Sequence, residues 1–326
     1  MSTRLALFMV GSLLALSLSA CYRPAPPTAT SLTPARPTAP SAPPPAAPPA
    51  SVLVDGSAQV ASLTTSIAAR FQQWQPAYRV EVGTAGTSAG FDRLCRGEID
   101  LVNAIRPMDT RAMSACAQHG VRWLEIVVAY DALAVIANPT DTFLTCLTLD
   151  ELRTVWREGG AQSWSAVRAS FPDLPLTPVF TELSPTLEQF LADRLGGAMR
   201  TDATPAGEDP PLVVAQTAGA VGLLEYARYG PQGAATHGVR FVEIDAGAGC
   251  TPPAPEMIWR GLYDALARPL YLYVNSASLQ RLPVSMFLGY ALSADGQATI
   301  AEAGYLPAAP EQYARALAII AAGGAE

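Results

Sequence analysis

The sequence predicts an α/β fold, because one pattern of strand, small-residue loop and amphipathic helix occurs three times after residue 50. The three units begin near Val52, Tyr78 and Leu176. In each unit a short apolar or alternating segment leads into a loop rich in small or hydroxyl residues, and apolar residues at helical spacing follow. Ligands of open α/β folds bind beyond the carboxyl ends of the strands, so we expect the three loops to converge on one site.

The first unit places the strand Val52–Val54 before the loop Asp55–Ser57. The helix that follows carries its apolar residues at Val60, Leu63, Ile67, Phe71 and Trp74. Ser57 stands where serine commonly caps a helix, and capping alone would explain it. Because the same arrangement recurs twice, we predict instead that Ser57 contributes to a binding site.

The second and third units supply the other candidate hydroxyls. The loop GTAGTSAG, residues 83–90, offers Thr87 and Ser88, and the loop of residues 181–186 offers Ser184 and Thr186. A helix start presents unpaired backbone N–H groups that suit the oxygens of a small anion. Pro185 fits a helix start but has no N–H group to donate.

Composition excludes several classes of protein. The chain has 326 residues, a formal net charge of -7 and a sequence pI of about 5.0, which suits about two domains and argues against a nucleic-acid partner. All 21 basic residues are arginine, so P-loop, Schiff-base and pyridoxal chemistry lack their lysine. Cys116 and His119 have a ligand-like spacing without a second half-site, so we expect neither a metal nor a cofactor.

The N-terminus has the features of an export signal. Arg4 precedes the apolar run Leu5–Ala20, which is too short for a membrane-spanning helix. The run ends in Leu18-Ser19-Ala20-Cys21, which resembles the lipobox of bacterial lipoproteins, whose cysteine carries the lipid. We therefore predict a signal peptide at residues 1–20 and lipidation at Cys21; the alternative is an ordinary signal peptide that contains a cysteine. The protein would then be extracytoplasmic, periplasmic or on the outer face of the cell membrane, and held there by its lipid.

Residues 21–50 are nearly all Pro, Ala, Thr and Ser. Such a segment cannot bury enough apolar surface to fold, and its prolines keep it extended. We predict a disordered tether that holds the folded part clear of the membrane. A segment that binds a proline-recognising partner is the alternative.

Several further stretches resemble the phosphate-binding proteins of bacterial phosphate ABC transporters, and their order along the chain carries the resemblance. They are Asp55–Ser57, Gly86–Gly90 with Gly97–Asp100 and Ala104–Pro107, Val128–Val135 with Asn138-Pro139, Leu147–Trp156, Ser184–Phe190, Gly219–Gly222 with Tyr226, Arg268–Val274, and Gly304–Pro307.

The resemblance implies a two-lobe periplasmic-binding-protein-like fold of type II, with a cleft between the lobes and two crossing strands. We place the crossings near residues 136–139 and near Arg268. Lobe one would hold residues 51–136 and 268–326, and lobe two residues 137–267. Closure of the lobes over a ligand would be the working motion.

Carrying the family's site over residue by residue keeps some groups and loses others. Ser57 matches the first loop, although Ala58 and Gln59 replace further hydroxyls, and the pair Thr87 and Ser88 matches the second. In the segment Ala104-Ile105-Arg106 the family's serine is lost, and Arg106 remains as a bidentate partner for an oxyanion. Ser184 and Thr186 are kept in the third loop, with Pro185 in place of glycine.

The resemblance implies a monomeric, non-enzymatic lipoprotein that captures a small oxyanion, phosphate first, for ABC permease subunits. A rival is a serine hydrolase, because Gly86-Thr87-Ser88-Ala89-Gly90 matches the G-x-S-x-G pattern and His237 follows it in the chain. A sensing or scaffolding lipoprotein on the same fold is a further alternative. Asp55 and Asp131 are candidates for accepting a ligand proton.

Four cysteines remain once Cys21 is assigned to the lipid: Cys95, Cys116, Cys146 and Cys250. An exported protein favours disulfides, and four cysteines allow three pairings. We prefer Cys95 with Cys116 and Cys146 with Cys250, because a bridge across the lobes would restrain closure. Four buried free thiols are the alternative.

Overall fold

A computed structural model of the chain describes residues 50–180, 183, 185–205 and 209–323. The predicted signal peptide, Cys21, Ser184 and the predicted tether up to residue 49 lie outside the described residues. None of the helices in the described part is long and apolar enough to cross a membrane.

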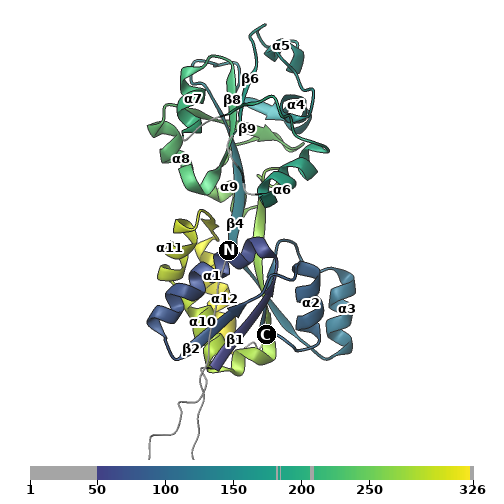
Figure 1. The fold of residues 1–326 in the computed structure, drawn as a ribbon, viewed down its shortest axis with the longest axis vertical. Helices are drawn as coiled ribbons and strands as arrows, with labels where there is room; N and C mark the ends of the chain where they lie inside the picture. Colours follow the sequence, from purple (N-terminus) through teal and green to yellow (C-terminus); the bar gives the residue numbers. More distant parts are fainter. Residues whose placement is uncertain (1–49, 181–182, 184, 206–208, 324–326) are drawn as a thin grey trace, which may run out of the picture. The chain divides into compact units, whose positions relative to one another are not determined.

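The strands and helices alternate along the chain (Figure 1). The strands are β1 Ala50–Gly56, β2 Tyr78–Val82, β3 Leu101–Ala104, β4 Trp123–Ala137, β5 Cys146–Thr148, β6 Thr177–Phe180, β7 Thr204–Pro205, β8 Ala220–Glu225, β9 Arg240–Asp245, β10 Cys250–Thr251, β11 Ala267–Asn275 and β12 Leu306–Pro307. The helices are α1 Ala58–Trp74, α2 Thr87–Cys95, α3 Thr110–Gln118, α4 Leu149–Trp156, α5 Trp164–Val167, α6 Pro185–Leu195, α7 Pro210–Gln216, α8 Tyr226–Thr236, α9 Pro255–Trp259, the 3-10 helix η1 Ser276–Gln280, α10 Leu282–Ala291, α11 Ala294–Glu302 and α12 Pro310–Ala321.

The first group of strands has the order β2-β1-β3-β11-β4, with β12 paired to β4. β1 runs parallel to β2 and β3, and β11 runs antiparallel to β3 and β4. α1 and α10 to α12 cover one face of this sheet, and α2 and α3 cover the other (Figure 1). Parallel strands joined by helices need both faces covered, as they are here.

The alternation of side chains along these strands assigns each residue to one of two cores. In β3, Leu101 packs into the core under α1 and α10, whereas Val102 packs into the core under α2 and α3. In β11, Leu272 belongs to the first core, and Tyr271 and Tyr273 to the second. Successive strand residues point to opposite faces, so the sequence of each strand determines both cores at once.

β4 is the strand that connects the two groups. Its residues from Trp123 to Ala132 pair with β11, and its residues from Leu133 to Ala137 pair with β8 and β9. β8 continues to β6 and β7, and β9 pairs with β5 and β10. Residues 128–137 are all buried, as expected of a strand covered on both faces.

The structure contains disulfide bonds between Cys95 and Cys116 and between Cys146 and Cys250, which is the pairing favoured above. The first joins α2 to α3, and the second joins β5 to β10. The first bridge therefore lies in the helices that cover the first group of strands, and the second lies among the strands paired with β9. The predicted α/β class is confirmed.

Candidate functional site

The loop between β2 and α2 is held against the end of β1 by Asp55. One carboxylate oxygen of Asp55 accepts hydrogen bonds from the N–H groups of Gly56 at 2.7 Å and Ala85 at 2.9 Å, and the other oxygen accepts from Nη1 of Arg93. The Gly86 N–H donates to the Gly56 carbonyl at 2.8 Å. These bonds join the first and second predicted loops.

The environment of Asp55 shows that its role here is structural. Burial alone would raise the pKa of Asp55, but the N–H groups of Ala85 and Gly56 and the guanidinium of Arg93 together hold that pKa below its usual value. A carboxylate kept charged in this way accepts the hydrogen bonds of the loop at neutral pH. Whether Asp55 also accepts a ligand proton stays a prediction.

Ser57 follows β1 and precedes the first turn of α1. Its N–H group donates to the Asn103 carbonyl at 2.8 Å, and its hydroxyl makes no capping bond to α1. Gly56 has φ 136°, and a Cβ there would come within 2.1 Å of the Asn103 carbonyl oxygen. Only glycine therefore fits beside β3 at this point. The hydroxyl of Ser57 remains available for something other than capping.

The predicted hydroxyl pair of the second loop lies in the first turn of α2. The N-cap of α2 is Gly86 with φ 97°, so Ser88 does not cap this helix. A positive φ favours glycine, and the cap therefore falls on Gly86, two residues before Ser88. Oγ1 of Thr87 is buried and has no hydrogen-bond partner in the described part of the chain.

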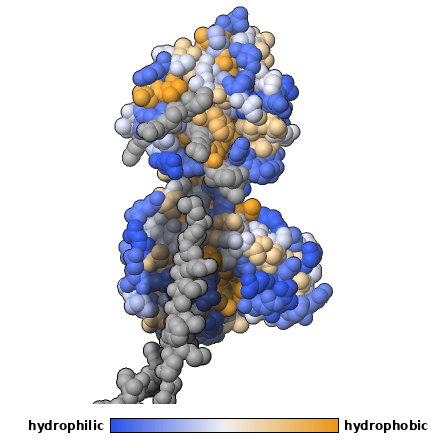
Figure 2. Space-filling model, in the orientation of Figure 1, coloured by the Kyte–Doolittle hydropathy of each residue, from blue (hydrophilic) through white to orange (hydrophobic). Residues whose placement is uncertain are grey.

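Arg106 follows β3 and contacts this turn. Its Nη2 donates to Oγ of Ser88 at 2.9 Å, and its Nη1 donates to Oδ2 of Asp109 at 3.0 Å and to the Pro107 carbonyl at 3.2 Å. The guanidinium lies 5.5 Å from the ring centroid of Phe91. The guanidinium is thus fixed beside the start of α2, where the helix already attracts negative charge. The outer face of α2 and α3 is mostly hydrophilic (Figure 2).

The structure therefore brings together three of the predicted site residues, Thr87, Ser88 and Arg106, and joins the loop of Ser57 to them. Their role in ligand binding stays a prediction. In the third loop Ser184 lies outside the described residues. Thr186 belongs to the first turn of α6, and its side chain is not among those described.

One buried cluster was missed by the sequence analysis. Nη2 of Arg268 donates to Oε1 of Gln59 at 2.6 Å and to Oδ2 of Asp131 at 3.1 Å, and Nε2 of Gln59 also donates to Asp131. The Arg268 guanidinium lies 4.7 Å from the centroid of the Phe190 ring on α6. Gln59 is in the first turn of α1, so the cluster adjoins the predicted first loop. Its only signal in the sequence is Gln59, which stands where the related family has a hydroxyl.

Charge in this cluster is balanced inside the protein. Burial raises the pKa of Asp131, and the Arg268 guanidinium and the Gln59 amide partly offset that rise. The side chains of Asp131 and Arg268 are 6% and 11% exposed, so each needs the other as a counter-charge. Asp131, considered above as a proton acceptor, is therefore engaged with Arg268.

The geometry around Ser88 does not suit a serine hydrolase. The charged neighbour of Ser88 is a guanidinium, which cannot accept a proton. Nδ1 of His119 lies 2.8 Å from the Ala115 carbonyl, and the ring of His237 lies 5.9 Å from that of Tyr229 on α8.

Across the described residues no group of three or more His, Cys, Asp or Glu side chains could hold a metal ion.

Known binding proteins match this chain in sequence and in fold. The profile of the PBP superfamily domain matches residues 41–294. The protein SphX of Synechocystis sp. is 32% identical over 272 residues, which cover 81% of this chain and 80% of SphX. The phosphate-binding protein PstS of Staphylococcus epidermidis is 26% identical over 261 residues, covering 79% of each chain.

The fold is also shared with a crystal structure described as a possible phosphate binding protein from Planctomyces limnophilus. The TM-score is 0.72 and the identity 29%, over 84% of this chain and 98% of the other. The predicted periplasmic-binding-protein-like fold is thereby confirmed. The Staphylococcus epidermidis and Planctomyces limnophilus relatives are named as binding proteins and not as enzymes, in agreement with the expectation that the chain is not an enzyme. Since the superfamily profile spans most of its length, the chain belongs to the PBP superfamily.

Proposed function

We propose that the protein is an extracytoplasmic solute-binding lipoprotein that captures a small oxyanion, phosphate first, for an ABC importer. The observation that carries the proposal is the group of donors at the start of α2. There the Thr87 hydroxyl has no partner in the described part of the chain, and the Ser88 hydroxyl is joined to the Arg106 guanidinium. The names of the PstS and Planctomyces relatives support phosphate as the oxyanion.

A buried hydroxyl without a partner loses free energy unless a ligand supplies the missing hydrogen bond. Thr87 lies in the first turn of α2, whose free N–H groups and dipole favour an anion. Each hydrogen bond to a charged group contributes about 1.5 to 3 kcal/mol, and micromolar binding requires about 8 kcal/mol. About three to six such bonds are therefore needed for micromolar capture.

The test is a calorimetric titration of the purified mature protein with phosphate and, separately, with sulfate. We expect saturable binding of phosphate. Replacing Thr87 with valine should weaken binding about tenfold or more without lowering the unfolding temperature, because the hydroxyl makes no bond that stabilises the free protein. Thr65→Val, at an exposed position on α1, is the matched control and should leave the affinity unchanged. No heat of binding with either anion would disprove the proposal.

The lipid anchor and the delivery to permease subunits rest on the sequence alone. Labelling cells with a radioactive fatty acid should mark the wild-type protein but not the Cys21→Ser variant. The fatty-acid label should then co-purify with membranes. Labelling of both proteins, or of neither, would contradict an anchor at Cys21.

A further inference from the structure

A cavity lies between α1, α10 and α11, on the helical layer that covers the first sheet. Its volume is about 900 Å³, within the range of small-molecule sites. The side chains that line it and matter here are Arg70, Gln73, Trp74, Tyr290, Asp295 and Glu302. Neither the predicted anion site nor the superfamily comparison accounts for this cavity.

An aromatic platform forms one wall of the cavity. Trp74, the last residue of α1, is 58% exposed, although large apolar side chains are usually buried. Its ring stacks on that of Tyr290 with centroids 6.0 Å apart and planes 25° apart, and the fully buried Phe71 meets it edge-on at 6.3 Å. These contacts fix the indole in one orientation before any ligand arrives, which lowers the entropic cost of binding.

Polar groups surround the platform. Nη2 of Arg70 and Oε2 of Glu302 form an ion pair at 2.7 Å. The side chains of Gln73 and Asp295 are exposed and line the same cavity. Donors and acceptors therefore occur together around one flat apolar surface.

This mixture of groups selects the class of ligand. The charges of Arg70 and Glu302 offset each other in their ion pair, and Asp295 remains to repel an anion. A neutral ligand with many hydroxyl groups can donate to the carboxylates and accept from Arg70 and Gln73 at the same time. Its apolar C–H face can lie against the negative face of the indole ring. We propose that this cavity is a saccharide-binding site.

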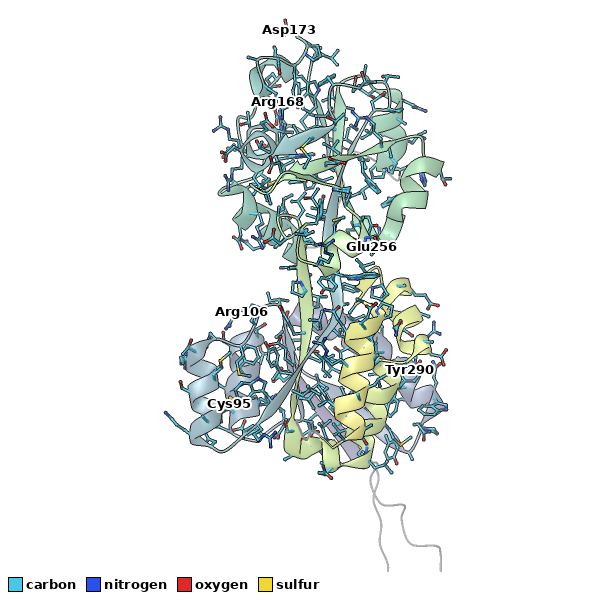
Figure 3. The ribbon with its side chains drawn as sticks, turned by 180° about the vertical axis from the view of Figure 1, so that it is seen from behind. Cys95, Arg106, Arg168, Asp173, Glu256 and Tyr290 are labelled. Carbon is cyan, nitrogen blue, oxygen red and sulfur yellow. A yellow bond between two sulfur atoms is a disulfide. The ribbon has the colours of Figure 1, made fainter. Side chains whose placement is uncertain are left out.

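The saccharide site is separate from the anion site. α1 begins beside Ser57 and ends at Trp74, and its 17 residues span about 25 Å at the rise of an α-helix. Figure 3 shows Arg106 and Tyr290 on opposite flanks of this part of the molecule. The two sites can thus be titrated independently, and failure of one proposal leaves the other intact.

The experiment follows the indole N–H resonance of Trp74 in the full mature protein, assigned by its disappearance in Trp74→Leu. Maltotriose and the trimer of N-acetylglucosamine are the probes. We expect one of them to shift this resonance with a dissociation constant on the order of 1 mM, and to bind in the presence of saturating phosphate as it does without. If neither trimer shifts it, the proposal is wrong.

A second variant blocks the cavity without removing any of its contacts. Gly289 lines the cavity within α10, and a Cβ built there meets no atom within 4 Å. Gly289→Leu should therefore fill the space, keep or raise the stability of α10, and weaken trimer binding at least tenfold. Leu282→Ala, at a 60% exposed position on α10 outside the cavity, is the control and should bind normally. Equal binding by Gly289→Leu, or a response to choline in place of the saccharides, would overturn the proposal.

Discussion

Nη2 of Arg106 lies 2.9 Å from Oγ of Ser88, and this bond fixes a positive charge at the N-terminus of α2. The two residues are 18 positions apart in the chain and follow β2 and β3, which both run parallel to β1 between them. The same guanidinium is restrained by Asp109 and by the Phe91 ring. Its position therefore depends little on whether a ligand is present, which is the condition for a preorganised anion site.

Replacing Arg106 with glutamine should weaken anion binding by about 10- to 150-fold. The substitution keeps a donor near Ser88 but removes the charge, and a hydrogen bond to a charged group contributes about 1.5 to 3 kcal/mol. Arg111→Gln is the matched control, because Arg111 is 85% exposed and lies 4.0 Å from Asp92. Calorimetric titration with phosphate measures both. An equal loss of affinity in the two variants would show that the overall charge of the protein, and not a direct contact from Arg106, determines anion binding.

Asp55 should make the folded protein sensitive to acid. Its pKa is lower in the folded protein than the value of about 3.9 expected in the unfolded chain. The stability that it contributes is therefore fully present above about pH 4, and it is lost as the pH falls through the folded pKa. Urea unfolding of the wild type between pH 7 and pH 2 should show this loss.

The Asp55→Asn variant should be less stable at pH 7 by about 1 to 3 kcal/mol and should lose less stability in acid than the wild type. An asparagine can satisfy the N–H groups of Gly56 and Ala85, but its amide then faces the Arg93 guanidinium. Asp173→Asn, at an exposed position bonded to Ser165, is the control. Acid curves of the same shape in wild type and Asp55→Asn would show that another carboxylate governs the transition.

Local sequence patterns predicted much of this molecule. Apolar spacing predicted the buried side of α1, including Val60, Leu63 and Ile67, and alternation predicted β2. These patterns are readable because each depends on residues a few positions apart. The cap of α2 could not be predicted in this way, since its position depends on the positive φ of Gly86, which the spacing of hydroxyl residues does not reveal.

The buried cluster could not be predicted in the same way. Gln59 lies 72 residues from Asp131 and 209 from Arg268, so only the completed sheet brings the three together. A single sequence gives no signal for such a contact unless a residue type is itself unusual at its position. The second predicted loop could be recognised from the sequence. Thr87 and Ser88 are neighbours in the chain, so predicting that they lie together required only the prediction of a helix start.

Removing Arg268 should destabilise the protein by about 3 to 5 kcal/mol, because Asp131 would be left as an unpaired buried charge. The Arg268→Met variant, unfolded in urea at pH 7, measures this. The double variant Arg268→Met/Asp131→Leu should recover a large part of the loss, since it removes both charges. Phe190→Leu is the control for the ring contact alone and should cost less. A double variant as unstable as Arg268→Met would show that the pair matters for packing and not for charge.

The two disulfide bonds should contribute unequally to stability. Cys146 and Cys250 are 104 residues apart, whereas Cys95 and Cys116 are 21 apart. A cross-link that closes a longer loop removes more entropy from the unfolded chain, about 4.7 kcal/mol for 100 residues against about 3 for a short loop. Two variants isolate the bridges: Cys95→Ala/Cys116→Ala keeps only the long loop, and Cys146→Ser/Cys250→Ser keeps only the short one. Full reduction, followed by urea unfolding, should lower the free energy of unfolding of the first variant by about 1 to 2 kcal/mol more than that of the second. The reverse order would mean that the unfolded chain retains structure around β5 and β10, so that the long loop is already closed without its bridge.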